Sequence, residues 1–315
     1  MSVTISEAVK YIGVDDKTID LFESQYVVPH GVSYNSYLIL DEKVALMDTV
    51  DTRGVEQWEK NLLAALDGRK VDYLVVSHLE PDHAGSIGRL VELFPEVTLV
   101  GNAKTFHMLP QFFDELPVDE NHKITVAEGE SLSLGTHTLN FYMAPMVHWP
   151  EVMVEYEETE KILFSADGFG KFGALSAEEE WTDEARRYFI NIVGKYGVQV
   201  QTLLKKAAAL DIQTICPLHG PILKDNLGFY IGKYLTWSSY EPEEDGVLVA
   251  CASIHGNTKA AAEKMVEVLR ANGASKVVFM DLTRDDMAEA VADAFRYGKI
   301  ILAAASYDAC VFPPM

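Results

Sequence analysis

Four side chains that commonly bind metal ions lie within six residues of the chain, in the stretch HLEPDH. They are His78, Glu80, Asp82 and His83, and they follow the apolar run VDYLVVS, which predicts a buried strand. In an extended segment, residues 78, 80 and 82 project to the same side, whereas Asp82 and His83 can diverge toward a second position. The pattern therefore predicts metal ligands at the end of a strand, with two ions sharing one loop.

Two ions need more ligands than this loop supplies. Three further candidates stand at predicted strand ends or turns: His148 in PMVHWPEV, Asp167 in LFSADGFG and His219 in CPLHGPI. The alternative is that such residues are structural, because an isolated Asp before Gly usually serves a turn. The grouping of four candidate ligands after one strand, with three more in strand–turn settings, favours a metal site.

The remaining histidines carry a weaker signal. We interpret His107, His122 and His137 as structural, since each stands alone in the sequence. For His30, in VVPHGVSYNSY, both a pocket role and a structural role stay open, and the structural one is favoured.

The composition excludes several classes of partner. A net charge of −22 argues against nucleic acid or an anionic membrane, because binding to these surfaces relies on Lys and Arg. The N-terminal residues lack the basic and apolar regions of a secretory signal, and no apolar run approaches the roughly 20 residues of a membrane span. Cys216, Cys251 and Cys310 are far apart, which excludes a cysteine-ligated iron–sulfur centre within the chain. We expect a cytoplasmic protein in a reducing compartment.

Local patterns predict the elements that position the ligands. Short β-branched and aromatic runs in residues 32–50 predict strands, and Val55–Leu66 predicts a helix. Residues 103–113 predict a helix that breaks at Pro110. Hairpins are expected over 122–165, and one long helix or a close pair over 178–210. Together these elements predict two sheets with helices on their outer faces.

The C-terminal part has a different texture. Residues 236–246, TWSSYEPEEDG, are rich in acids and contain a proline, and we interpret them as a linker. Beyond them, strand and helix patterns alternate as βαβαβ, which is typical of a doubly wound parallel sheet. We therefore expect two domains, residues 1–240 and 246–315.

A short polar loop, SIHGNTKAAA, follows the first strand of this second domain and opens a helix. Ser253, Asn257 and Thr258 offer hydroxyl and amide groups, and Gly256 lets the backbone approach a ligand closely. A helix N-terminus favours an anion. The loop is therefore a candidate phosphate site, although many helices begin with a capping Thr or Asn.

The ligand array resembles that of the metallo-β-lactamase fold, whose hydrolases typically carry HxHxDH, with Glu80 replacing the second histidine. HxExDH followed by His, Asp and His at these spacings is similar to the A-type flavoprotein, or flavodiiron, family. HGVSYNSYLI, HWPEVM and YFINIVGKYGVQVQTLLKK also resemble this family. The resemblance implies an α/β and α+β chain: a metallo-β-lactamase-like αββα sandwich and then a partial flavodoxin-like doubly wound parallel sheet.

The resemblance also implies the metal ligands. One iron would be held by the residues matching His78, Glu80 and His148. The other would be held by those matching Asp82, His83 and His219, with Asp167 bridging. No catalytic residue is required beyond these ligands. An anionic oxygen in place of a neutral imidazole suits iron that cycles between ferrous and ferric states, whereas zinc hydrolases favour imidazoles.

In the second domain, the resemblance to a flavodoxin implies bound FMN. The implied contacts are Ser253, His255, Gly256, Asn257 and Thr258 in the first loop, and Ser306, Tyr307, Asp308 and Ala309 beside the ring. The domain departs from the family because it carries three strands where a flavodoxin-like sheet has five. That leaves the strand in IILAAAS as an exposed apolar edge, and we interpret the chain as a fragment of a longer protein.

The family resemblance implies an enzyme that reduces O2 to water, NO to N2O, or both. Electrons would enter through FMN from a separate donor such as rubredoxin, and a head-to-tail homodimer would bring one subunit's flavin to the other's irons. Two alternatives stay open. One is a hydrolase with two zinc ions, and the other is a diiron module that binds O2 as a sensor with a degenerate flavin half.

Overall fold

The computed structural model describes residues 5–113, 116 and 118–315, and the chain divides into two compact units. The first unit comprises residues 1–185 and 198–231. The second comprises residues 186–197 and 232–315. The segment 186–197 thus belongs to the second unit, although the chain on both sides of it belongs to the first.

The strands of the first unit are short. Their bounds are β1 Val9–Tyr11, β2 Val14–Asp16, β3 Leu21–Phe22, β4 Tyr26–Val27, β5 Val32–Tyr34, β6 Tyr37–Leu40, β7 Val44–Met47, β8 Tyr73–Val75, β9 Thr98–Asn102, β10 Lys123–Val126, β11 Ser131–Ser133, β12 Thr138–Met143, β13 Met153–Glu157, β14 Ile162–Phe164 and β15 Thr214–Cys216. They form one sheet in the order β1-β6-β7-β8-β9-β10 and another in the order β11-β12-β13-β14-β15. Two small antiparallel ribbons, β2-β5 and β3-β4, accompany them.

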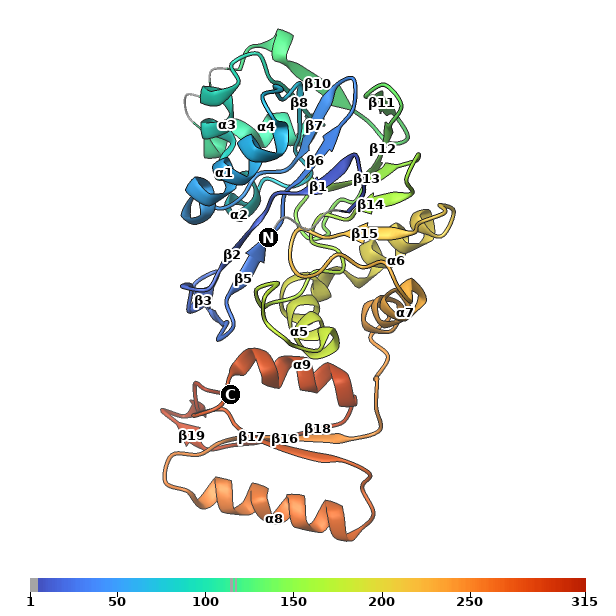
Figure 1. Ribbon diagram of the computed structural model, residues 1–315. Coiled ribbons are helices and arrows are strands. Elements are labelled where there is room, and N and C mark those ends of the chain that lie inside the picture. Colours follow the sequence, from blue (N-terminus) through green and yellow to red (C-terminus); the bar gives the residue numbers. More distant parts are fainter. Residues whose placement is uncertain (1–4, 114–115, 117) are drawn as a thin grey trace. The chain divides into compact units, whose positions relative to one another are not determined.

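The two sheets share one apolar core. Tyr37 and Val75 from the first sheet belong to the same buried cluster as Phe141 and Phe164 from the second, and Tyr37 lies 5.5 Å from Phe164 between ring centroids. Helices cover the outer faces, with α1 and α4 on the first sheet and α6 beside the second (Figure 1). This is the predicted αββα sandwich.

The helices before the second unit's sheet have the following bounds: 3₁₀-helix Thr52–Gly54, α1 Val55–Leu66, α2 Pro81–Ala84, α3 Ile87–Leu93, α4 Ala103–Phe112, 3₁₀-helix Glu120–His122, α5 Trp181–Tyr188, π-helix Phe189–Val193, 3₁₀-helix Gly194–Tyr196, α6 Gly197–Ala207 and α7 Leu227–Ser238. Helix α1 has the predicted bounds. The helical region over 178–210 is a close pair, α5 and α6, because a π-helical turn and a 3₁₀-helix separate them.

The predicted break at Pro110 is wrong. Helix α4 continues through Pro110 to Phe112, and Phe113 N–H still donates to Leu109 O at 3.1 Å. A proline costs the helix one hydrogen bond at its own nitrogen. Here it stands near the C-terminal end of a helix that buries Leu109 and begins with a well-made cap. The Asn102 side chain accepts hydrogen bonds from Lys104 N–H and Thr105 N–H.

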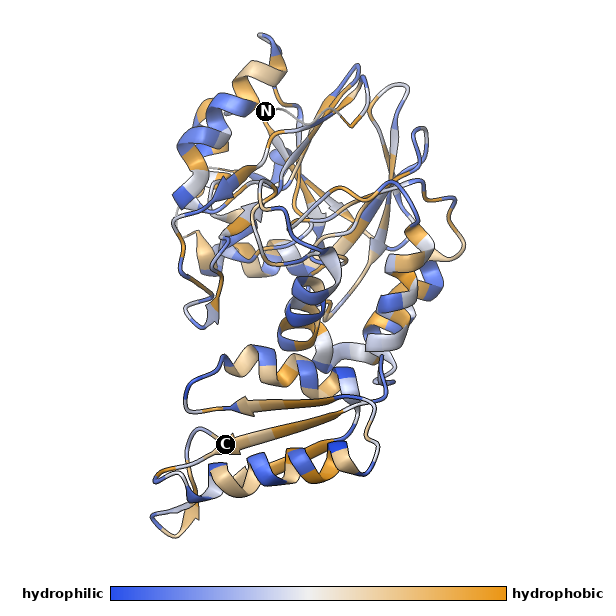
Figure 2. Ribbon diagram, turned by 60° about the horizontal axis from the view of Figure 1, so that its bottom comes forward, coloured by the Kyte–Doolittle hydropathy of each residue, from blue (hydrophilic) through white to orange (hydrophobic). Residues whose placement is uncertain are grey.

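The second unit contains a parallel sheet in the order β17-β16-β18, formed by β16 Val247–Ala252, β17 Val277–Asp281 and β18 Ile300–Ala304. Helices α8 Asn257–Ala271 and α9 Met287–Tyr297 cover opposite faces of it (Figure 1). Val249 and Cys251 of β16 pack with α8, and Leu248 and Ala250 pack with Tyr297 of α9. Figure 2 shows apolar strands between two helices that each carry a hydrophilic face.

Strand β18 forms one edge of this sheet within the described part of the chain. Its alternate residues face outward, with Ile300 48% and Leu302 66% exposed. The exposed apolar edge that the sequence predicted is therefore present. A short ribbon of β19 Ser306–Tyr307 and β20 Cys310–Val311 follows.

The predicted domain limits, 1–240 and 246–315, stay a prediction, and the compact units do not coincide with them. Contacts inside the second unit explain the difference. Arg186 forms an ion pair with Glu243, and the Asn191 side chain donates to Ala288 O at 3.1 Å. Such long-range partners are invisible in local sequence patterns. Among the described residues, no helix is long and apolar enough to cross a membrane.

Candidate metal centre

The motif loop divides its four ligand candidates between two local structures. Strand β8 ends at Val75, and an extended segment carries His78 and Glu80 to the N-terminus of α2. Pro81 occupies the first turn of α2, where its missing N–H costs nothing. Asp82 and His83 then lie in the first helical turn. The change from strand to helix therefore turns the two pairs of ligands in different directions.

The other three candidates come from the second sheet. His148 lies in the loop between β12 and β13, Asp167 follows β14, and His219 follows β15. Strands β14 and β15 are parallel, with Phe164 opposite Cys216, so the residues that follow them emerge at the same edge. The structure brings all seven predicted residues together at that edge of the sandwich.

The seven residues form two groups. In the first, Glu80 Oε2 lies 3.2 Å from His78 Nε2 and 3.0 Å from His148 Nε2. In the second, Asp82 Oδ2 lies 3.1 Å from His219 Nε2 and 3.4 Å from His83 Nε2. Within each group the candidate ligand atoms all lie within 4.8 Å of one another, which is close enough to surround a single ion.

Asp167 faces both groups at once. Its Oδ2 lies 3.2 Å from His148 Nε2 and 3.3 Å from His78 Nε2, whereas its Oδ1 lies 3.2 Å from His83 Nε2 and 3.7 Å from His219 Nε2. One carboxylate oxygen is thus directed to each group. This is the arrangement that a carboxylate bridging two cations requires.

The burial of these residues supports a pair of cations. All are buried except Glu80, which is half-buried. In the part of the chain that the structure describes, both oxygens of Asp82 and of Asp167 lack a hydrogen bond, as do the Nε2 atoms of His83 and His148. Buried polar atoms of this kind are costly unless something pairs with them. Carboxylates and imidazoles whose ligand atoms converge in this way are suited to metal ions.

The pKa shifts of His148 and Asp167 also support a cation site. Burial lowers the pKa of His148, but the adjacent carboxylates of Asp167 and Glu80 outweigh it and raise the pKa to about 9. For Asp167, burial raises the pKa, but the positive field of His83 and the closely placed rings of His148 and His78 hold it well below its usual range. The carboxylates of the centre therefore favour a positive charge beside them, which a metal ion can supply in place of a proton.

The family model of the ODP family beta lactamase matches residues 32–220. A nitric oxide reductase of Moorella thermoacetica is 32% identical over 291 residues, which cover 88% of this chain and 71% of the relative. Among solved structures, rubredoxin oxygen:oxidoreductase from Desulfovibrio gigas is 28% identical with a TM-score of 0.92, covering 100% of this chain and 80% of that one. The chain belongs to the flavodiiron protein family. The flavodiiron protein from Giardia intestinalis has a TM-score of 0.93 at 26% identity, covering 100% of this chain and 78% of that one.

This flavodiiron chain spans about two thirds of the length of several curated relatives, for example 65% of one anaerobic nitric oxide reductase flavorubredoxin. The match to the solved structures confirms the fold, including the flavodoxin-like part. The zinc-hydrolase and sensor alternatives fall outside the family names that these relatives carry.

The residues predicted to contact FMN lie in two loops at one edge of the flavodoxin-like sheet. Ser253, His255 and Gly256 lie between β16 and α8, Asn257 and Thr258 begin α8, and the residues 306–309 follow β18. The two strands are adjacent and parallel, with Ala252 opposite Ala304, so both loops leave the sheet at the same edge. Gly256 has a φ of +90°, and its N–H donates to Ser253 Oγ at 3.0 Å. The contacts themselves stay a prediction.

The other histidines are held by acidic neighbours. His137 Nδ1 lies 2.8 Å from Asp41 Oδ2, His122 Nδ1 lies 2.9 Å from Asp119 Oδ1, and His30 Nε2 lies 3.1 Å from Glu179 Oε1. None of them, nor the exposed His107, joins a metal-binding group of the described residues.

Sequence reasoning missed the residues that hold the ligands in place. The His78 ring is hydrogen-bonded to Glu151, and the His219 ring to the backbone oxygen of Ser33 at 2.7 Å. For Glu151 a signal existed, since an acid in the apolar context HWPEVM stands three residues after His148. For Ser33 the sequence carries no signal, because every residue type offers the same backbone oxygen.

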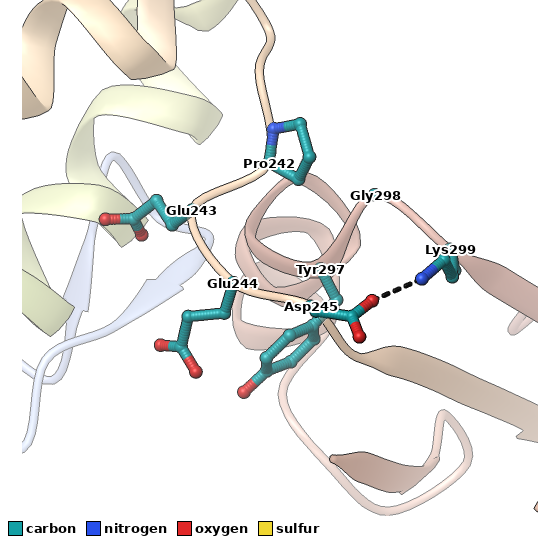
Figure 3. A pocket seen from close by; sticks show the side chains of 7 residues that line it. All are labelled: Pro242, Glu243, Glu244, Asp245, Tyr297, Gly298 and Lys299. Carbon is teal, nitrogen blue, oxygen red and sulfur yellow. Dashed lines mark hydrogen bonds and ion pairs between the residues drawn. The ribbon is translucent and has the colours of Figure 1, made fainter. Parts of the chain in front are cut away.

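A surface pocket of about 260 Å³ lies elsewhere, around the linker between Pro242 and Asp245 and the turn at Gly298 (Figure 3). Its acids already have cationic partners. Glu243 pairs with Lys233 at 2.6 Å, and Asp245 pairs with Lys299. The pocket therefore contributes to neither predicted site.

Proposed function

We propose that this chain is an oxidoreductase that reduces O2 to water, NO to N2O, or both, at two iron ions. His78, Glu80 and His148 would hold one iron, Asp82, His83 and His219 the other, and Asp167 would bridge them. The observation that carries the proposal is the placement of Asp167, whose two oxygens face different groups of ligands. The names of the relatives, nitric oxide reductase and rubredoxin oxygen:oxidoreductase, support the two substrates.

When bound, the iron pair would supply Lewis acidity and electrons to the diatomic substrate. The protein's own residues set the conditions for that chemistry. Glu80, Asp82 and Asp167 contribute negative charge, which favours ferric over ferrous iron more than a set of neutral imidazoles does. Phe22 lies 5.3 Å from His219 between ring centroids, in a T-shaped contact, and both side chains are buried.

We further propose that FMN passes electrons to this centre, since reduction of O2 to water takes more electrons than a ferrous pair holds. Gly256, Asn257 and Thr258 would bind its phosphate at the N-terminus of α8. Ser253 and His255 would complete that loop, and Ser306, Tyr307, Asp308 and Ala309 would lie beside the ring. The exposure of both loops leaves room for such a ligand.

The electron donor would be rubredoxin or a similar small protein, as the name of the Desulfovibrio gigas enzyme suggests. We also propose a head-to-tail homodimer in the cytoplasm. In such a dimer the flavin of one subunit would serve the irons of the other.

Anaerobic expression in cells supplied with iron and zinc, followed by measurement of metal and flavin per chain, tests the proposal. We expect two irons and FMN in the protein, with consumption of O2 or NO when reduced rubredoxin is added. Two zincs without iron would contradict the redox function and favour hydrolysis. Two irons that bind O2 without turnover, in a protein holding no FMN, would favour a sensor instead.

A further inference from the structure

Glu151 is a buried acid that contacts the first group of ligands from behind. Its side chain is fully buried, and its Oε1 lies 2.8 Å from His78 Nδ1. The same oxygen accepts the backbone N–H of Leu79 at 2.9 Å. The backbone of Glu151 is fixed in turn, because the Asn102 side chain donates to Glu151 O at 2.5 Å.

This contact determines which nitrogen of the His78 ring carries the proton. A carboxylate that accepts the Leu79 N–H acts as an acceptor, so the proton of the contact with His78 lies on Nδ1. The Nε2 lone pair is then left on the side of Glu80 and Asp167. In the described part of the chain, Oε2 of Glu151 has no hydrogen-bond partner. A buried, half-satisfied anion is a cost to folding, and stability alone does not explain a charge there.

The histidines of the second group lack such a partner. His219 Nδ1 donates to a neutral acceptor, Ser33 O, at 2.7 Å. His83 Nδ1 makes no hydrogen bond to any residue that the structure describes. Asp48 is also buried behind this loop, but its Oδ1 accepts the Ser77 N–H at 2.8 Å. The histidine–carboxylate hydrogen bond is therefore specific to His78 among these three rings.

The two groups are otherwise matched. Each supplies two imidazoles and one carboxylate of its own, and each is faced by one oxygen of Asp167. The contact of His78 with Glu151 breaks this equality. A hydrogen bond to a carboxylate fixes the orientation of an imidazole ligand and makes its free nitrogen more basic, so it strengthens metal binding at one position only.

We propose that Glu151 is a positioning residue that makes the two metal positions unequal, so that the position of His78, Glu80 and His148 takes the first ion. This inference rests on the proposed function, because it assumes two metal ions. Loss of such a partner typically costs about 10- to 100-fold in metal affinity. The second position, formed by Asp82, His83 and His219, does not depend on Glu151.

Titration of the metal-free full chain with Fe(II), without oxygen, tests the proposal in two backgrounds. His219→Ala leaves the first position complete, and His148→Ala leaves the second. Glu151→Gln keeps an oxygen that accepts the Nδ1 proton but removes the charge. We expect it to weaken Fe(II) binding about 10- to 100-fold in the His219→Ala background and to leave binding in the His148→Ala background unchanged.

Glu155→Gln is the matched control. Glu155 is another fully buried acid in the same part of the chain, and it accepts a hydrogen bond from Ser77 Oγ at 2.9 Å without contacting a ligand ring. We expect wild-type Fe(II) affinity at both positions. As a spectroscopic readout, Mössbauer spectra of the 57Fe-loaded Glu151→Gln protein should show one iron signal changed and the other retained.

Equal weakening at both positions, or no weakening in the His219→Ala background, would overturn the inference. If Glu151→Gln does not fold by circular dichroism, Glu151→Asp replaces it. Since that variant keeps the charge on a shorter side chain, weaker binding confined to the first position supports the inference, and weaker binding at both positions overturns it. A wild-type chain that takes up no pair of ions would overturn the proposed function itself, which is a distinguishable result.

Discussion

Glu80 Oε2 lies 3.0 Å from His148 Nε2, so the residue that distinguishes this motif from HxHxDH lies among the ligand atoms of the first group. We predict that Glu80→His lowers the iron content and raises the zinc content of protein from cells supplied with both metals. The physical reason is the loss of an anionic oxygen that favours iron. Reductase activity should fall about tenfold or more.

Elemental analysis and O2 or NO consumption measure these effects. Glu92→Gln is the control, because Glu92 is an exposed acid paired with Arg89 at 2.9 Å and should leave the metal content unchanged. A Glu80→His protein that keeps wild-type iron would contradict the role given to Glu80.

Asn35 fixes the loop that carries His219. Its Nδ2 donates to Pro217 O and Gly220 O, both at 2.8 Å, and its Oδ1 accepts from Tyr11 at 3.1 Å. We predict that Asn35→Ala lowers the free energy of unfolding by about 2 to 4 kcal/mol, because buried acceptors lose their donor. Urea denaturation measures this change. The control is Asn121→Ala, at an exposed position, which should stay within about 0.5 kcal/mol of wild type. Similar losses of stability in both variants would disprove that Asn35 fixes the His219 loop.

The pair of Asp41 and His137 gives stability a defined pH dependence. Burial raises the pKa of Asp41, but hydrogen bonds from His137 hold it well below its usual range. Burial lowers the pKa of His137, but the hydrogen bond to Asp41 outweighs it and raises the pKa. The Asp41 contribution is present above the ordinary Asp value and is lost at lower pH. The His137 contribution is present below the ordinary His value and is lost as pH rises through the raised value.

We therefore predict that Asp41→Asn destabilises the protein most between about pH 4 and pH 6.5, the ordinary values of Asp and His. The expected loss is about 1 kcal/mol, shrinking on either side of this window. Urea denaturation at a series of pH values measures it. Asp119→Asn removes the more exposed partner of His122 and should show little pH dependence. A constant difference for Asp41→Asn across all pH values would refute the prediction.

Gly256 occupies the left-handed region with a φ of +90°, and a Cβ there would meet no atom within 4 Å. Gly256→Ala therefore introduces backbone strain without a clash, costing about 1 to 2 kcal/mol. We predict weaker FMN binding, measured by flavin fluorescence. Gly228→Ala is the matched control, since its Cβ also has open space and its backbone has no positive φ. Equal FMN affinity in the two variants would argue against a role of this loop in FMN binding.

The exposed edge of β18 predicts self-association. Leu302 is 66% exposed on a strand that lacks a neighbour on one side among the described residues. We predict that Leu302→Lys reduces aggregation of this chain, because a charge on an edge strand opposes pairing with another copy. Light scattering against concentration measures the effect. Val198→Lys, at a 74% exposed position in α6, should change nothing, and an equal benefit there would point to net charge as the cause.

Much of the candidate centre could be predicted because its key residues are adjacent in sequence. His78, Glu80, Asp82 and His83 follow one strand, and any fold that ends the strand there keeps them together. The three distant candidates were predictable because each stands at a predicted strand end or turn. Their division into two groups came from family resemblance; the side chains gather in two such groups, and their binding of metal stays a prediction.

The holders of the ligands could not be predicted. The contact of Glu151 with His78 joins residues 73 positions apart, and tertiary packing alone decides it. In the same way, the segment 186–197 joins the second unit through Arg186 and Asn191, whose partners lie far along the chain. Pro110 failed as a signal because the burial of Thr105 and Leu109 and the cap at Asn102 outweigh one missing hydrogen bond.

The candidate ligands come from both layers of the sandwich: His78 and His83 from the segment after β8 in one sheet, and Asp167 and His219 from the strand ends of the other. Ions held by these residues would act as an internal cross-link, as a disulfide does in a secreted domain. The three cysteines of the chain are all free, so no disulfide links the sheets. Bound metal ions would then stabilise the fold as well as supply reactivity. If the proposed ions were removed, the two sheets would lose this link at the edge where the candidate ligands meet.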